Sequence, residues 1–89
     1  MDAKIEKDLI AIQKNFGTDR QESKLYEELN ELLIAIDSGI KKDVIEEKAD
    51  CFCLLFQEYL TNKQIQKAVV YKIERTQERI KSGYYEEVE

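Results

Sequence analysis

The chain contains no proline, and its three glycines, at positions 17, 39 and 83, fall where helical segments would end. Proline disrupts a helix interior, whereas glycine is favoured just after a helix C-terminus. The segments between these breaks are rich in Leu, Ile, Glu, Lys and Gln, most of which have high helix propensity. The sequence therefore predicts an all-α fold with short connections.

Hydrophobic spacing places two helices in the first half of the chain. The first ends near Gly17 and carries one apolar stripe, formed by Ile5, Leu9, Ile12 and Phe16. A capping box of Thr18 and Gln21 predicts a second helix that continues to about Ser38. Its apolar arc consists of Leu25, Leu29, Leu32, Leu33 and Ile36, and the flank of that arc consists of Gln21, Lys24, Glu28, Glu31 and Ala35.

A capping box of Asp43 and Glu46 predicts a third helix that reaches about Thr61. Apolar residues cover most of its circumference, and such a helix is buried on more than one side. One short domain, residues 1–89, offers little to cover it. We therefore expect an antiparallel bundle of about four helices that assembles through the third helix into a homo-oligomer, a dimer or a tetramer.

The fourth helix is predicted from about Gln64 to Lys81, followed by an acidic tail, residues 84–89, that is expected to be frayed. Its buried arc is predicted to contain Ile65, Ala68, Val69, Ile73 and Ile80. Lys72 and Arg79 lie seven residues apart at the edge of this arc. Two cations beside a core face need a carboxylate or a bound anion as partner.

Charge and composition exclude several classes of protein. A net charge of −5 argues against binding to a nucleic-acid polymer, which requires clustered Lys and Arg. The longest apolar run, residues 51–56, is too short to span a bilayer, and the N-terminal residues lack the apolar core of a signal peptide. A cytoplasmic protein with no membrane association is expected.

The two cysteines and the absence of histidine limit the possible metal sites. Cys51 and Cys53 point to different sides of a helix, so we expect reduced core thiols. Without histidine, zinc and di-iron sites of the Glu-x-x-His type are disfavoured. Carboxylate oxygens remain as ligands, and these suit Mg²⁺, Mn²⁺ or Ca²⁺.

Two pairs of carboxylates, each with members three residues apart, are the candidate site. Glu28 pairs with Glu31 on the second helix, and Glu47 pairs with Asp50 on the third. Residues three apart lie on one face of a helix, so a hairpin would bring all four together. Like charges at close range destabilise a fold unless a cation lies between them. The alternative is a solvated acidic surface, common in a chain with 37% charged residues.

Three segments carry the charged residues in a recognisable order: Lys24-Leu-Tyr-Glu-Glu-Leu-Asn-Glu-Leu32, then Glu46-Glu-Lys-Ala-Asp50, then Lys72 with Arg79. Together they resemble the MazG-like family of all-α nucleoside triphosphate pyrophosphohydrolases. The first segment is similar to the family's Lys-Leu-x-Glu-Glu-x-x-Glu-Leu, the second to its Glu-Glu-x-Ala-Asp, and the third to a later Lys and Arg of the family. The resemblance extends from about Gln21 to Arg79, in the same order and on the predicted helices.

The resemblance implies a Mg²⁺-dependent enzyme, with Mn²⁺ as a possible substitute. The four carboxylates Glu28, Glu31, Glu47 and Asp50 would be the metal ligands and catalytic groups. The enzyme would cleave a nucleotide between its α- and β-phosphates to a monophosphate and pyrophosphate. Lys24, Lys72 and Arg79 would contact phosphates, and Gln21 the base or sugar.

Other interpretations remain open at this point. Lys24 is equally placed to form an ion pair with Glu28, four residues later. The whole chain could be a helical interaction module without chemistry, or a degenerate homologue that binds nucleotide or metal without turnover. Mg²⁺ dependence distinguishes the module from the enzyme.

Overall fold

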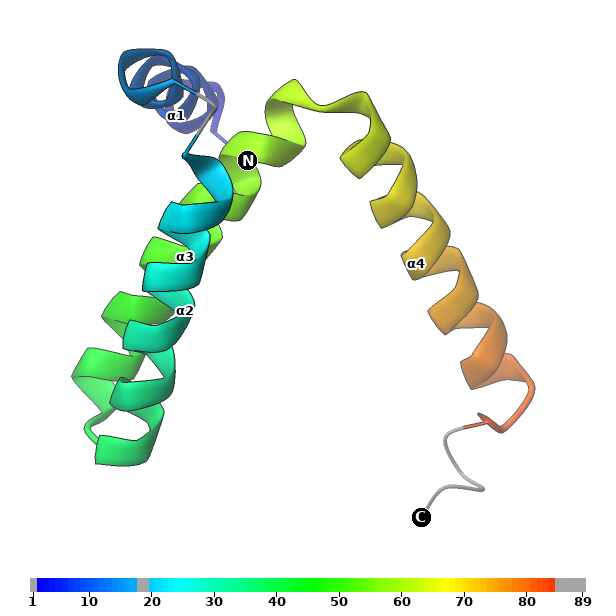
Figure 1. Cartoon of the computed structure of the whole chain (residues 1–89). Helices are drawn as coiled ribbons and strands as arrows, with labels where there is room; N and C mark the ends of the chain where they lie inside the picture. The colour runs from blue at the N-terminus through cyan, green and yellow to red at the C-terminus, as the bar shows by residue number, and fades with distance from the viewer. Residues whose placement is uncertain (1, 18–19, 85–89) are drawn as a thin grey trace.

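The computed structural model describes residues 2–17 and 20–84, and these residues form four α-helices and no strand. The helices are α1 (Ala3–Phe16), α2 (Gln21–Ser38), α3 (Lys41–Thr61) and α4 (Lys63–Lys81). Figure 1 shows α2 and α3 side by side, α1 lying across one end of α3, and α4 extending away from the others. The predicted all-α class and the number of helices are confirmed.

Helices α2 and α3 form a helical hairpin, residues 21–61, around a two-residue connection. Gly39 adopts a left-handed conformation (φ 74°), and its N–H donates to the Ile36 carbonyl. A residue with a Cβ atom rarely adopts this conformation, so glycine suits the turn. The Ser38 hydroxyl then accepts a hydrogen bond from the Ile40 N–H at 3.3 Å, which continues the chain into α3.

The helix starts differ from the predicted capping boxes. The N-cap of α3 is Ile40, which offers no capping side chain, and Asp43 lies inside the first turn, so the box of Asp43 and Glu46 is wrong. The N-cap of α2 is Arg20, again without a side-chain cap. Thr18 lies outside the described residues. Local pattern locates a helix end only within a few residues.

Helix α4 follows α3 after a single extended residue, Asn62, which acts as its N-cap. The Asn62 carboxamide oxygen accepts hydrogen bonds from the N–H groups of Gln64 and Ile65. Across the corner, the Gln66 carboxamide donates to the Tyr59 carbonyl at 2.7 Å. Within the described part of the chain, α4 packs against α3 and against no other helix.

The hairpin closes through strips of mixed polar and apolar side chains. On α2, Leu25 and Leu32 are half-buried and Ala35 is buried. The rest of the apolar arc predicted for α2 faces outward, since Leu33 is 60% exposed and Ile36 is 50% exposed. The predicted burial of this arc is therefore realised only in part within one chain.

The other helices also leave apolar residues in contact with solvent. In α1, Leu9 and Gln13 are buried while Ile12 and Phe16 are exposed. In α4 no described residue is buried, and the predicted buried arc is wrong for the isolated chain. Cys53 is exposed, so only Cys51 matches the expected core thiol. No helix among the described residues has the length and apolar character needed to cross a membrane.

Candidate metal centre

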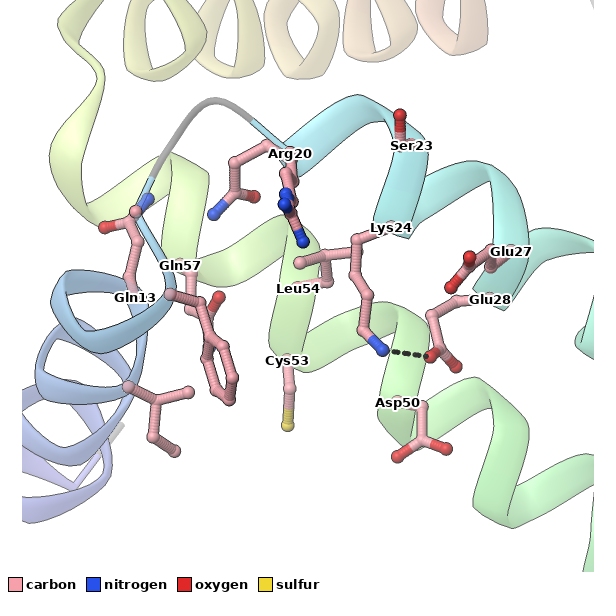
Figure 2. Close-up of a pocket in the computed structure, with 14 residues that line it drawn as sticks. Gln13, Arg20, Ser23, Lys24, Glu27, Glu28, Asp50, Cys53, Leu54 and Gln57 are labelled. Carbon is pink, nitrogen blue, oxygen red and sulfur yellow. Dashed lines mark ion pairs between the residues drawn. The ribbon is translucent and has the colours of Figure 1, made fainter.

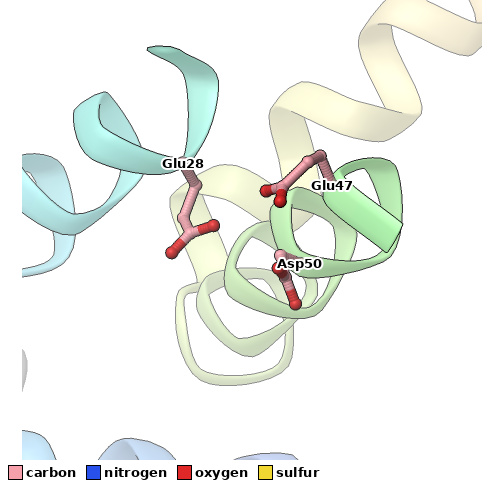
Figure 3. Close-up of side chains that lie close together, drawn as sticks. All are labelled: Glu28, Glu47 and Asp50. Carbon is pink, nitrogen blue, oxygen red and sulfur yellow. The ribbon is translucent and has the colours of Figure 1, made fainter. Parts of the chain in front are cut away.

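Three carboxylates from the two helices of the hairpin converge. Glu28 of α2 and Glu47 and Asp50 of α3 lie close together, and one carboxylate oxygen of each residue lies within 4.8 Å of the other two (Figure 3). Glu28 lies one heptad before the buried Ala35, on the face of α2 that packs against α3. Glu47 and Asp50, three residues apart, share the facing strip of α3. We call these three residues the carboxylate cluster.

Glu31, the fourth predicted ligand, lies beside the carboxylate cluster. It is exposed and does not share the 4.8 Å spacing. Its negative charge nevertheless contributes to raising the pKa of both Glu28 and Glu47. The structure thus brings three of the four predicted carboxylates together and leaves Glu31 at the margin.

Burial and mutual repulsion make this cluster electrostatically unfavourable without a cation. The pKa of Glu28 is raised by burial first and then by the charges of Glu31 and Asp50, with Lys24 opposing the shift. The pKa of Glu47 is raised by burial and by Glu31. Burial and the same negative charges also raise the pKa of the Cys51 thiol, so this neighbour stays neutral.

Two oxygens of the cluster show that its residues fit a divalent metal. Glu28 Oε2 and Glu47 Oε2 are buried, and neither has a hydrogen-bond partner among residues 2–17 and 20–84. A buried carboxylate oxygen without a partner is costly, and a cation satisfies it directly. Hard oxygen donors alone match the ligand preference of Mg²⁺ and Mn²⁺.

Lys24 forms the ion pair that its spacing predicts. Its Nζ lies 3.6 Å from Glu28 Oε1, while the lysine side chain is 59% exposed and the glutamate side chain only 13% exposed. The Lys24 ammonium therefore remains accessible beside the cluster. A pair of this kind leaves the second oxygen of Glu28 unpartnered.

A pocket of about 600 Å³ adjoins the carboxylate cluster between α1 and the helical hairpin (Figure 2). Glu28 and Asp50 belong both to the cluster and to the pocket wall. The rest of the lining is of mixed character and consists of Ile12, Gln13, Phe16, Gly17, Arg20, Gln21, Ser23, Lys24, Glu27, Cys53, Leu54 and Gln57. The volume is typical of small-ligand sites.

Gln21 lies in this wall as predicted, and its Oε1 is buried without a partner among the described residues. Sequence reasoning missed Gln13, Phe16, Arg20 and Gln57 as wall residues. The sequence could have identified Gln57 as a wall residue, because it lies seven residues after Asp50 on the same strip of α3. The indication for Gln13 is weaker: it is a polar residue four positions after the buried Leu9.

Lys72 and Arg79 are not brought to the cluster of their own chain. Both are on α4, which extends away from the hairpin (Figure 1). The Lys72 ammonium lies 5.9 Å from the centroid of the Tyr71 ring, and the Arg79 guanidinium lies 4.7 Å from that of Tyr84. Neither forms an ion pair with a carboxylate in the described part of the chain.

Comparison with protein-family models, with curated proteins and with solved structures finds no match to this chain.

Proposed function

We propose that this chain is a Mg²⁺-dependent nucleoside triphosphate pyrophosphohydrolase that releases pyrophosphate and a nucleoside monophosphate. The observation that carries the proposal is the carboxylate cluster with two buried, unpartnered oxygens at the edge of a ligand-sized pocket. An acidic cluster alone repels an anionic substrate. A cluster that binds a cation attracts it, and the adjoining pocket offers room for the remainder of the molecule.

Glu28, Glu47 and Asp50 would hold the metal. When bound, Mg²⁺ supplies charge neutralisation for the polyphosphate and acidifies the attacking water. A carboxylate of the site accepts the proton of that water, and Glu31 is available because it lies outside the converging set. Lys24, which is largely exposed beside Glu28, stabilises negative charge on the phosphate oxygens.

The pocket would receive the nucleoside. Its wall combines the apolar side chains of Ile12, Phe16 and Leu54 with carboxamides and the Arg20 guanidinium. Flat bases suit an apolar wall that includes an aromatic ring, and carboxamides offer both a donor and an acceptor to a base edge. Gln21 retains its predicted role in contacting base or sugar.

The proposal includes a homo-oligomer in the cytoplasm. The apolar residues left exposed on the hairpin and on α4 support assembly, since contiguous exposed apolar patches mark interaction surfaces. Both cysteines are free, which agrees with a reducing compartment.

Pyrophosphate release from a panel of nucleoside triphosphates tests the activity. We expect Mg²⁺-dependent release from at least one nucleotide, and its loss in Glu47→Gln. Glu46→Gln is the matched control, because Glu46 is exposed on α3 and belongs neither to the carboxylate cluster nor to the pocket wall; it should retain most of the parent rate. Absence of release across common and modified nucleotides would contradict the enzyme and favour a module that binds without turnover.

A further inference from the structure

The corner between α3 and α4 prevents α4 from covering its own hairpin. Two helices that fold back on each other need a connection of about two to five residues, and α2 and α3 use two, Gly39 and Ile40. Asn62 alone joins α3 to α4, and its side chain caps the N-terminus of α4. The Gln66 carboxamide of α4 donates a hydrogen bond to the Tyr59 carbonyl of α3. Folding α4 back onto α3 would break both sets of hydrogen bonds.

Two apolar surfaces therefore lack a cover within the described chain. On the hairpin, the exposed apolar side chains are Leu29, Leu33 and Ile36 of α2 and Ile45, Phe52 and Leu55 of α3. On α4 they are Val69, Ile73 and Ile80, of which Ile80 is 63% exposed. Lys72 and Arg79 border the second surface, each one residue before an isoleucine. Burial of these surfaces against each other would remove apolar side chains from water on both sides.

Charge makes the same two surfaces complementary. The hairpin carries ten acidic and four basic side chains, whereas α4 carries six basic and two acidic ones. The ion pairs among the described residues lie on α1, α2 and α3, so the cations of α4 have no carboxylate partner there. Opposite charge steers such surfaces together and fixes their register.

The area left exposed matches the needs of a dimer. The chain has 7540 Å² of accessible surface, about 2000 Å² more than expected for a compact monomer of its mass. Its radius of gyration, 16.1 Å, likewise exceeds the roughly 12 Å expected for this length. Twice that excess, about 4000 Å² for two chains, falls within the range of obligate dimers.

We infer that two copies of this chain exchange helix α4, so that Lys72 and Arg79 of each copy serve the carboxylate cluster of the other. A second copy would bury both sets of exposed apolar side chains, because its α4 packs against the hairpin of the first copy and its hairpin packs against the α4 of the first copy. This reciprocity closes the pair with twofold symmetry. The contact of these cations with substrate phosphate rests on the proposed function, whereas the exchange itself rests on the corner, the surfaces and the charge.

Isotope-mixed cross-linking tests the exchange without any activity. Chains labelled with ¹⁵N are mixed with unlabelled chains, allowed to equilibrate and treated with a carbodiimide, which couples lysines to carboxylates in contact. We expect Lys72 to couple to a hairpin carboxylate, with about half of the coupled peptides containing one labelled and one unlabelled partner. If every cross-link between Lys72 and the hairpin joined two labelled or two unlabelled peptides, the contact would lie within one chain and the exchange would be wrong. A monodisperse monomer in light scattering would also overturn the exchange.

Mixing two inactive variants tests whether the partner completes the site. The first variant, Glu47→Gln, has an altered carboxylate cluster and an intact α4. The second variant combines Lys72→Gln and Arg79→Gln, so its α4 is altered and its carboxylate cluster is intact. In a mixed dimer, one site unites an intact cluster with an intact α4, so an equimolar mixture should recover about a quarter of the parent activity. Lys67→Gln, on the far side of α4, should retain the parent rate.

Failure of the exchange is distinguishable from failure of the proposed function. An active parent whose two variants are folded, dimeric and inactive together would overturn the exchange and leave the enzyme standing. An inactive parent would instead contradict the enzyme, and the isotope distribution of the cross-links would still decide the exchange. Circular dichroism and light scattering verify the fold and size of each variant.

Discussion

Two glutamates of the carboxylate cluster are held in a setting that disfavours their charge. The pKa values of Glu28 and Glu47 are raised by burial and by neighbouring carboxylates. A carboxyl with a raised folded-state pKa contributes stability fully below its unfolded-state pKa. That contribution is lost as the pH rises through the folded-state value. The metal-free protein is therefore less stable at neutral pH than the same fold with a neutral side chain in this place.

Glu47→Gln tests this effect, because glutamine is neutral at every pH. In the presence of a chelator, we expect the variant to have a higher Tm than the parent at pH 7 and an equal Tm at pH 4. Addition of Mg²⁺ should reverse the order at pH 7, because the parent binds the ion more tightly than the variant and gains more stability from it. Thermal unfolding followed by circular dichroism measures all three comparisons. A lower Tm for the chelator-treated variant at pH 7 would contradict the account.

Asp50 and Glu31 should differ in their effect on metal affinity. Asp50 shares the converging set of oxygens and Glu31 does not. We expect Asp50→Asn to lower the Mg²⁺ affinity at least about tenfold, and Glu31→Gln to lower it less. Isothermal titration calorimetry measures both constants. An equal loss of Mg²⁺ affinity in the two variants would show that Glu31 contributes as much to metal binding as Asp50 does.

At the scale of a helix, the side chain of Asn62 caps the start of α4. Asn62 accepts hydrogen bonds from two backbone N–H groups at the start of α4. We expect Asn62→Ala to destabilise the protein by about 1 kcal/mol, the usual cost of losing an N-cap. Asn62→Asp, which keeps an acceptor oxygen, should cost less. Hydrogen exchange at Gln64 and Ile65 reports the cap, and unchanged protection in Asn62→Ala would contradict its role.

The pairing of α2 with α3 also explains where the carboxylates lie. Each helix turns a strip of mixed polar and apolar side chains toward the other, so Glu28 and Glu47 are half-buried while Leu33 and Phe52 are exposed. A hairpin closed through Leu33 and Phe52 would instead leave the carboxylates solvated. The same geometry therefore brings the carboxylate cluster together and leaves apolar side chains exposed on the outside of the hairpin.

At the scale of the molecule, folding and assembly should be coupled. Leu9, Ala35 and Cys51 are the buried apolar residues that the structure describes, which is a small core for 89 residues. When the folded chain is stabilised by a second copy, its Tm depends on protein concentration. We expect the Tm to rise over an about hundredfold increase in concentration. A constant Tm, measured by scanning calorimetry and by fluorescence at the two extremes, would indicate a self-sufficient monomer.

The sequence by itself determined the local structure and the chemistry available to it. The absence of proline, the apolar periodicity and glycines such as Gly39 defined the four helices, because these signals act over a few residues. The spacing of Glu47 and Asp50 placed them on one face for the same reason. The absence of histidine, which leaves carboxylate oxygens as the available metal ligands, likewise follows from residue types alone.

Only the tertiary structure decided which faces meet. Helical period assigns Leu33 and Glu28 to different faces of α2 but does not say which face α3 will contact, since that choice depends on residues distant in the sequence. The same holds for three other features: the pocket beside α1, the position of Glu31 outside the carboxylate cluster, and the direction that α4 takes after Asn62. These features arise from packing and from connection length, which the local sequence pattern does not encode.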